Sequence, residues 1–333
     1  MSSNSLQEKT TKYFEIHKQL RDILKWKVPD NRVNMMIASL YVVNQRDFHA
    51  GNFLDIVAAI KKQAGMFSVL RSYQGFTTAG MLDVNFEQPI HQIEQLLDLY
   101  NQFVKAKFQR GSFTYIAASV LLTNEQSATD NTAVINKAMK LYQRMKKEHA
   151  FLTNKGDYPL VTLLAQADEP VDDLIARTEL FYDRLNQEGF RKGNDLQFLS
   201  HVLSLNNQEN VNTLVSQAIQ MHDTFASYKI KAKSLYYPVM GMLTLLPPGE
   251  VNMTAITDIY EQLNKEKHFK WQKDMNLIMA INFYVSGRLN NSKLSETSIY
   301  TTMETIIQAQ QAVMYATIAS TTAAAASSNN SSN

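Results

Sequence analysis

An apolar pattern that returns about every 40 residues constrains the fold of this chain more than any other feature of its sequence. Each copy has a hub residue, with an apolar residue three positions after it and mostly apolar residues four and seven positions before it. Residues at these spacings share one face of a helix, so the pattern predicts an amphipathic first helix in every copy. The hubs are Tyr100, Tyr142, Tyr182, His222 and Tyr260.

A second helix is predicted in the same copies. Eight or nine residues after each hub an apolar residue returns in a short connector, and a residue with an oxygen-bearing side chain follows it. Such a side chain can accept a hydrogen bond from the free N–H groups of a helix's first turn. An apolar run comes next, which predicts the second helix. The expected capping residues are Ser112, Asp157, Asn194, Ser234 and Asp274.

The predicted fold is all-α: an α-solenoid of paired antiparallel helices, bent into a curved superhelix because each pair buries its apolar faces against its neighbours. The alternative is a compact helical bundle in which the likeness between copies is accidental. We expect divergent N-terminal helix pairs in residues 1–90, the five-copy array in 91–290, a capping helix in 291–326 and a disordered tail in 327–333. In the capping helix, the residues expected to pack against the last repeat are Ile306, Ile307, Met314 and Ile318.

The chain lacks cysteine, which excludes disulfides, thiolate nucleophiles and cysteine-bound metals. Its first 20 residues contain no apolar stretch of the signal-peptide kind, and no uncharged apolar run of membrane-spanning length precedes the C-terminal segment. We therefore expect a cytoplasmic protein. The net charge of +2 is too small to indicate a nucleic-acid or membrane partner, so any charged surface must be local.

No sequence motif for catalysis or for a cofactor stands out. The phosphate-binding loops GxGxxG and GxxxxGK[ST], the zinc motif HExxH and the nucleophile motif GxSxG do not occur. The seven histidines are scattered, without the close helical spacing of metal ligands. The adjacent acids Asp172 and Asp173 begin a predicted helix, where they favour a helix-dipole role over acid–base catalysis. We predict no catalytic residue, no cofactor and no metal.

Three stretches of the sequence are distinctive in combination. They are GMFSVLRSYQGFTTAGML near the start, LYQRMKKEHAFLTNKGDYPLVTLLA with FLSHVLSL in the middle, and IIQAQQAVMYATIASTTAAAASS at the end. Together they resemble a family of bacterial proteins known as domain of unknown function 4003, or DUF4003. The resemblance spans nearly the whole chain and implies no activity, substrate or catalytic residue. Ala150 and Gly156 stand where Pro and Asp are expected, which argues against a strict binding motif in the connector before Tyr158.

One aligned position in the middle of each second helix is small except for a histidine: Ser119, Thr162, His201, Gly241 and Ala280. A row of small residues predicts a groove for a partner helix or peptide, with nearby methionines as adaptable contacts and two polar anchors. The alternative is that small residues only let neighbouring helices pack closely. The candidate groove residues are Ser119, Thr162, Ser200, His201, Met240 and Met279.

Basic residues gather in the connectors between first and second helices, and acids such as Glu169, Asp172 and Glu209 gather toward the other end of the pairs. Equivalent connectors of a solenoid lie along one edge, so the pattern predicts a basic edge. Cations near helix C-termini also complement the helix dipole, which produces the same pattern without any partner. The sharper hypothesis is an anionic partner, nucleic acid or an acidic protein face, bound beside Phe108 and Trp271. The candidate basic edge contains Lys107, Arg110, Arg191, Lys192, Lys229, Lys231, Lys233, Lys270 and Trp271.

The architecture favours a non-catalytic binding or scaffolding protein that presents a concave helical-repeat surface to a protein or peptide. The alternative is an enzyme or small-molecule sensor with a site in the groove. Clustered acids or histidines with perturbed pKa values in a deep pocket would favour the alternative. A shallow groove with aromatic anchors would favour the binding protein.

Overall fold

In the computed structural model, the described residues are 3–291, except 29, 67, 124–129, 151 and 248, together with Met314. These residues form helices and contain no strand, which confirms the predicted all-α class. The odd-numbered helices are α1 (Ser3–Leu24), α3 (Ala50–Gln63), α5 (Gln92–Lys105), α7 (Asn131–Glu148), α9 (Val171–Gln187), α11 (Val211–Ser227) and α13 (Met253–Lys265). The even-numbered helices are α2 (Asn31–Val43), α4 (Tyr73–Asn85), α6 (Ser112–Thr123), α8 (Tyr158–Ala165), α10 (Asn194–Ser204), α12 (Tyr237–Thr244) and α14 (Lys273–Asn291).

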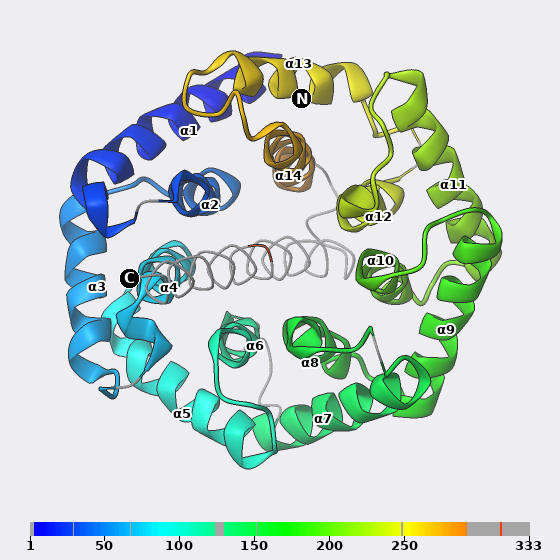
Figure 1. Cartoon of the computed structure of the whole chain (residues 1–333), viewed down its shortest axis with the longest axis horizontal. Helices are drawn as coiled ribbons and strands as arrows, with labels where there is room; N and C mark the ends of the chain where they lie inside the picture. The colour runs from blue at the N-terminus through cyan, green and yellow to red at the C-terminus, as the bar shows by residue number, and fades with distance from the viewer. Residues whose placement is uncertain are drawn as a thin grey trace, which may run out of the picture.

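The helices close into a ring, in which the odd-numbered helices form the outer layer and the even-numbered helices, seen end-on in Figure 1, form the inner layer. The first pair meets the last: α1 packs against α13 and α14, and α2 packs against α14. At this seam, Lys9 Nζ donates a hydrogen bond of 2.9 Å to Ser286 Oγ. The expected α-solenoid arrangement is therefore not confirmed, because the bend between successive pairs brings the first pair onto the last. The repeat of about 40 residues and the division into domains stay predictions.

The two layers differ in how much of each helix is buried. An outer helix buries one stripe and leaves its other side to solvent, as the amphipathic pattern predicts; α5 buries Ile93, Leu96, Leu99, Tyr100 and Phe103. An inner helix has neighbours on all sides, and every residue of α8 and of α12 is buried. A helix that is apolar all round is stable only in such a position.

The expected capping residues take several roles at the starts of the inner helices. Asp157 forms a capping box with Asn154 in the short 3-10 turn before α8. The side chain of Asp274 instead accepts hydrogen bonds from Lys233, and the N-cap of α10 is Gly193 and not the expected Asn194. The short turn at residues 234–236 shifts the start of α12 past its expected capping residue, Ser234.

The connectors divide between two faces of the ring. Connectors that lead from an outer to an inner helix contact the starts of neighbouring inner helices: the Gln109 N–H donates to the Tyr158 hydroxyl (3.4 Å), and the Arg191 N–H to the Tyr237 hydroxyl (3.0 Å). Connectors that lead from an inner to an outer helix contact one another on the opposite face, where Asn207 Nδ2 donates to Glu169 Oε1 at 2.6 Å. All connectors of one kind therefore share one face.

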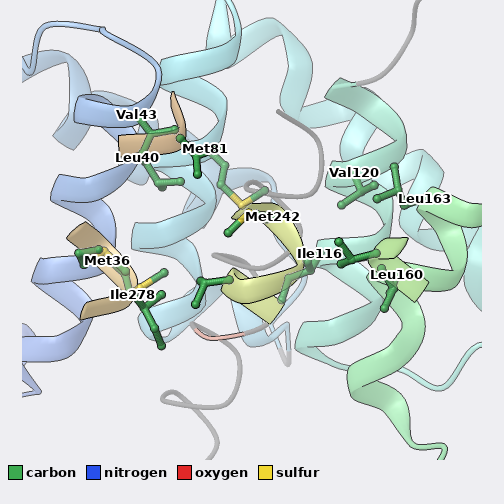
Figure 2. Close-up of a cluster of buried hydrophobic side chains, with 14 of the residues drawn as sticks. Met36, Leu40, Val43, Met81, Ile116, Val120, Leu160, Leu163, Met242 and Ile278 are labelled. Atoms are coloured by element: carbon green, nitrogen blue, oxygen red, sulfur yellow. The ribbon is translucent and has the colours of Figure 1, made fainter. Parts of the chain in front are cut away.

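A single apolar core joins the two layers and extends inside the ring. Buried side chains from six inner helices, α2, α4, α6, α8, α12 and α14, contribute to the cluster in Figure 2, among them Met36, Met81, Met242 and Ile278. Met314 is helical, half-buried and packed against this core. The other expected cap residues, Ile306, Ile307 and Ile318, lie outside the described residues. No helix in the described part of the chain is long and apolar enough to cross a membrane.

Candidate functional site

The structure buries the six candidate groove residues, all of which lie on inner helices and none of which is more than 4% exposed. Three of them use their hydroxyls within their own helix: Ser119, Thr162 and Ser200 donate to the carbonyl four residues earlier, at 2.9, 2.8 and 2.9 Å. A partner could contact these side chains only if the inner helices moved apart. The other three buried residues are His201, Met240 and Met279.

Close packing of the inner helices explains the row of small residues better than a groove does. A Cβ on Gly241 of α12 would lie 2.8 Å from Leu199 Cδ1 and 3.0 Å from Val202 Cγ1 of α10. These distances leave no room for a side chain, so glycine sets how closely α10 and α12 approach. A groove at this row stays a prediction that would need a change of conformation.

We expect Gly241→Ala to lower the free energy of unfolding by about 1–3 kcal/mol, because the added methyl group must displace packed side chains. Gly51→Ala is the matched control: Gly51 also lies in a helix, and a Cβ there meets nothing within 4 Å. That substitution should raise the free energy of unfolding by about 0.5–1 kcal/mol. Urea unfolding of both variants measures whether each substitution lowers or raises the free energy of unfolding. Equal changes in the two variants would show that α10 and α12 are not tightly packed at Gly241.

The residues of the candidate basic edge are exposed, and all lie on the face that carries the outer-to-inner connectors. We call this face the basic face and define it by residues 25–28, 30, 64–66, 68–72, 106–111, 149–150, 152–157, 188–193, 228–236 and 266–272. The sequence of these segments contains 13 lysines and arginines and 4 acidic residues. Phe108 is an exception to the prediction, because it is 2% exposed and packs against Phe103 and Tyr158.

The opposite face has the reverse charge. Its described connector residues are 44–49, 86–91, 130, 166–170, 205–210, 245–247 and 249–252, and they contain seven acidic residues and one basic residue, Arg46. The molecule is therefore strongly polarised across the ring, although its net charge is only +2.

Three lysines of the basic face hold backbone conformations that favour glycine. Lys25, Lys107 and Lys229 have φ angles of 44°, 77° and 59°. Lys107 and Lys229 each follow the C-cap residue of an outer helix, and Gly189 takes the same place after α9 with a φ of 93°. A non-glycine residue in this left-handed region costs about 1–2 kcal/mol. Such outliers persist where their surroundings fix them, and they cluster at functional sites.

The hydrogen bonds that fix Lys107 and Lys229 match the one at Gly189, where Phe190 N–H donates to the Leu185 carbonyl at 3.0 Å. Phe108 N–H donates to the Phe103 carbonyl at 3.1 Å, and Ile230 N–H to the Phe225 carbonyl at 3.0 Å. This six-to-one bond is the Schellman motif, in which an apolar residue also packs back on the helix. The connectors thus present their lysines from well-defined backbone positions.

One lysine of the basic face is neutralised. Lys233 Nζ lies 2.6 and 2.8 Å from the two carboxylate oxygens of Asp274, which also accepts a hydrogen bond of 2.5 Å from the Tyr236 hydroxyl. Partial burial opposes the charge on Asp274, but the hydrogen bonds from Lys233 and Tyr236 lower its pKa. The ion pair of Lys233 with Asp274 therefore connects the α11–α12 connector to α14, and Lys233 contributes little free charge to the basic face.

Residues of the first two connectors belong to the basic face but were not among the sequence candidates. They include Lys25, Lys27 and Arg71, and also Trp26, which is 82% exposed, as Trp271 is at 83%. The signal that could have found them is the same placement of basic residues after an amphipathic helix. It is weaker here because the N-terminal pairs depart from the register of the later copies.

The described part of the chain holds no group of three or more histidines and acids that could bind a metal ion. His201 is buried with neither ring nitrogen hydrogen-bonded, and burial lowers its pKa to about 3. His149 Nε2 lies 2.6 Å from Glu179 Oε2 in an isolated pair. Neither arrangement combines a nucleophile, a base and a cavity, so the basic face remains the strongest candidate site.

Comparison with known proteins places this chain among relatives of unknown activity. Residues 16–312 match the family model described as "Protein of unknown function (DUF4003)". The chain is 38% identical over 321 residues to "Uncharacterized protein YeaA" of Bacillus subtilis (strain 168), an alignment that covers 96% of this chain and 97% of the relative. No solved structure gives a significant match.

Proposed function

This chain belongs to the DUF4003 family, and we propose that it is a non-catalytic cytoplasmic binding protein whose basic face docks an acidic protein or peptide. The observation that carries the proposal is the left-handed conformation of Lys25, Lys107 and Lys229. Glycine would hold these positions at lower free energy, as Gly189 does. Lysine at these positions adds a cation to the basic face that glycine would not supply.

The helix pairs support the proposal by placing equivalent connectors side by side around the ring (Figure 1). A repeated pair would multiply one basic connector into a charged face. Long-range attraction from such a face speeds the encounter with an acidic partner.

Exposed apolar residues on the same face favour a protein partner over nucleic acid. Trp26 and Trp271 could contact either, since tryptophan is common both in protein interfaces and beneath stacked bases. Met66 is 78% exposed and Leu235 is 42% exposed, and neither offers a ring for a base to stack on. Aliphatic and aromatic anchors among cations are typical of the centre of a protein interface.

The test uses fluorescein-labelled polyglutamate as the acidic probe and follows anisotropy at low and at physiological salt. We expect Lys229→Glu/Lys231→Glu to weaken binding about tenfold or more, because each reversal turns an attraction into a repulsion. Lys18→Glu/Lys140→Glu makes the same change of net charge on exposed residues of the outer helices and is the matched control. Equal weakening in both double variants, or no binding at low salt, would overturn the proposal.

Lys229→Gly separates binding from helix termination. Glycine relieves the left-handed conformation, so the free energy of unfolding should stay equal or rise by up to about 1 kcal/mol, while binding to polyglutamate weakens. Helix capping alone predicts no loss of binding. Binding of single-stranded RNA, measured in the same way as polyglutamate binding, decides the class of partner. If RNA binds more tightly and depends equally on Lys229 and Lys231, the partner is nucleic acid and not an acidic protein.

A further inference from the structure

We infer that a cavity at the seam of the ring binds a small phosphate ester that also carries hydroxyl groups. The cavity has a volume of about 480 Å³ and opens on the basic face, where the α1–α2 pair meets the α13–α14 pair. The site goes beyond the proposed function, because a macromolecule could dock on the basic face without it. The lining residues used below are Arg21, Lys25, Asn31, Asn34, Lys267 and His268.

Three cations converge on the cavity from different segments of the chain. Arg21 comes from the end of α1, Lys25 from the turn after it and Lys267 from the α13–α14 connector. No acidic residue is among the described residues that line the cavity. The nearby Asp30 is engaged by Arg32, whose guanidinium approaches its carboxylate to 2.6 Å. The cavity therefore has a positive potential suited to an anion of more than one charge.

The kinds of cation favour phosphate. A guanidinium presents parallel N–H groups that match two phosphate oxygens, and lysine supplies further charge. Lys25 holds its position through a φ of 44°, so the backbone at the cavity wall takes a conformation that lysine rarely adopts. Lys107 and Lys229 on the same face have the same kind of backbone conformation.

Hydrogen bonds fix the wall of the cavity before any ligand binds. His17 Nε2 donates to Asn31 Oδ1 at 2.7 Å, and Asn31 Nδ2 donates to the His268 carbonyl at 2.9 Å. Burial lowers the pKa of His17 to about 4, so this ring is neutral near pH 7. Asn31 thus joins α1, α2 and the α13–α14 connector, and a preformed wall reduces the ordering cost of binding.

An unsatisfied polar atom points to the rest of the ligand. Asn34 lines the cavity and is 3% exposed, and its Oδ1 has no hydrogen-bond partner in the described structure. Leaving a buried carbonyl oxygen unpaired is costly, and a ligand hydroxyl could donate to it. A cavity of 480 Å³ is also within the usual range for small-molecule sites and is too large for bare phosphate. A sugar phosphate has both the phosphate group that the cations favour and a hydroxyl group that can donate to Asn34.

A ligand at this position should stabilise the closed ring. It would contact the first and the last helix pair together, and a molecule that binds only the folded state raises the free energy of unfolding. The thermal transition therefore reports on the site without any knowledge of a downstream activity.

The experiment measures Tm and calorimetric binding for the full chain with ribose 5-phosphate, AMP, inorganic phosphate and ribose at constant ionic strength. We expect ribose 5-phosphate to raise Tm and to bind more tightly than inorganic phosphate, while ribose alone does neither. Lys267→Gln and Arg21→Gln should weaken binding about tenfold or more, since each removes a charge-assisted contact. Lys192→Gln, an exposed cation elsewhere on the basic face, should leave it unchanged.

The outcomes are separable from those of the proposed function. Lys229→Glu/Lys231→Glu should weaken polyglutamate binding about tenfold or more and leave ribose 5-phosphate binding intact, because neither lysine lines the cavity. If Lys192→Gln and Lys267→Gln weaken ribose 5-phosphate binding equally, the binding reflects only electrostatic attraction to the whole basic face, and the inference is overturned. Absence of binding by every phosphate compound would overturn it as well. If inorganic phosphate binds as tightly as the sugar phosphates, Asn34 does not accept a hydrogen bond from the ligand. The affinity of AMP relative to that of ribose 5-phosphate shows whether the cavity accepts a base.

Discussion

Between pH 7 and pH 5 the folded protein should lose about 2 kcal/mol of stability because of His201 alone. Burial lowers the pKa of this histidine to about 3, with a smaller contribution in the same direction from nearby His149. The unfolded chain has an ordinary histidine pKa of about 6.5 and binds the proton first as the pH falls. The stability that this group contributes is therefore present above pH 6.5 and is lost progressively below it.

The prediction is tested as a difference between variants. His201→Leu replaces the ring by an apolar side chain, so its free energy of unfolding should fall by about 2 kcal/mol less than that of the unchanged protein between pH 7 and pH 5. His222→Gln is the control, because His222 is only half-buried. Urea unfolding at the two pH values gives both differences. A parallel loss in His201→Leu and in the unchanged protein would show that His201 titrates normally.

A difference is needed because another buried group acts in the opposite direction. Burial raises the pKa of Asp157 to about 7, against a backbone hydrogen bond from Asn154 that lowers it. The folded protein therefore binds a proton at Asp157 before the unfolded chain does, which favours folding as the pH falls from about 7 toward 4. The pH dependence of the unchanged protein is the sum of these effects, and only the variant isolates His201.

The sequence predicts the outer helices well because their surroundings are simple. An outer helix has one buried stripe, and the hub spacing records that stripe directly: Tyr100, Tyr142 and Tyr182 are buried where the pattern expects them. The basic edge was predictable for a similar reason, since exposed connectors keep their charges. Lys107 and Lys229 are exposed as expected, whereas their left-handed conformation is a property of the backbone that composition does not reveal.

Closure of the ring could not be predicted from the same pattern. Periodicity reports which face of a helix is buried, but not which helix covers that face. The bend between helix pairs depends on packing details, such as the close approach of α10 and α12 at Gly241. The burial of the candidate groove residues could not be predicted for the same reason. Small residues such as Ser119 and Thr162 lie between helices that approach closely, and the sequence gives the same signal for a groove and for a tight contact. The seam cavity also depends on closure, because Lys25 and Lys267 are more than 200 residues apart in the chain.

Tyr13→Ala should lower the free energy of unfolding by about 3–5 kcal/mol, because Tyr13 is the central aromatic residue of the seam. It lies in α1, is fully buried and contacts Phe269 and Phe283 with ring centroids 5.2 and 5.1 Å away. Truncation leaves a cavity between the first and last helix pairs that the surrounding helices cannot fill without opening the ring. Tyr13→Phe is the conservative control: the Tyr13 hydroxyl is buried without a hydrogen-bond partner, so its removal should leave stability unchanged or raise it.

Hydrogen exchange shows whether the ring is one cooperative unit. In a closed ring, loss of the Tyr13 contacts removes packing from both sides of the seam, so amides of α1, α13 and α14 should all exchange faster in Tyr13→Ala. Phe181 is a fully buried residue of α9 on another part of the ring. Phe181→Ala should lower the free energy of unfolding by a similar amount without preferentially speeding amide exchange in α1, α13 and α14. In an open solenoid the Tyr13 variant would loosen α1 alone, because a terminal unit contacts only its next neighbour. Unchanged exchange of α13 and α14 in Tyr13→Ala would therefore contradict the closed ring, and with it the seam cavity that depends on closure.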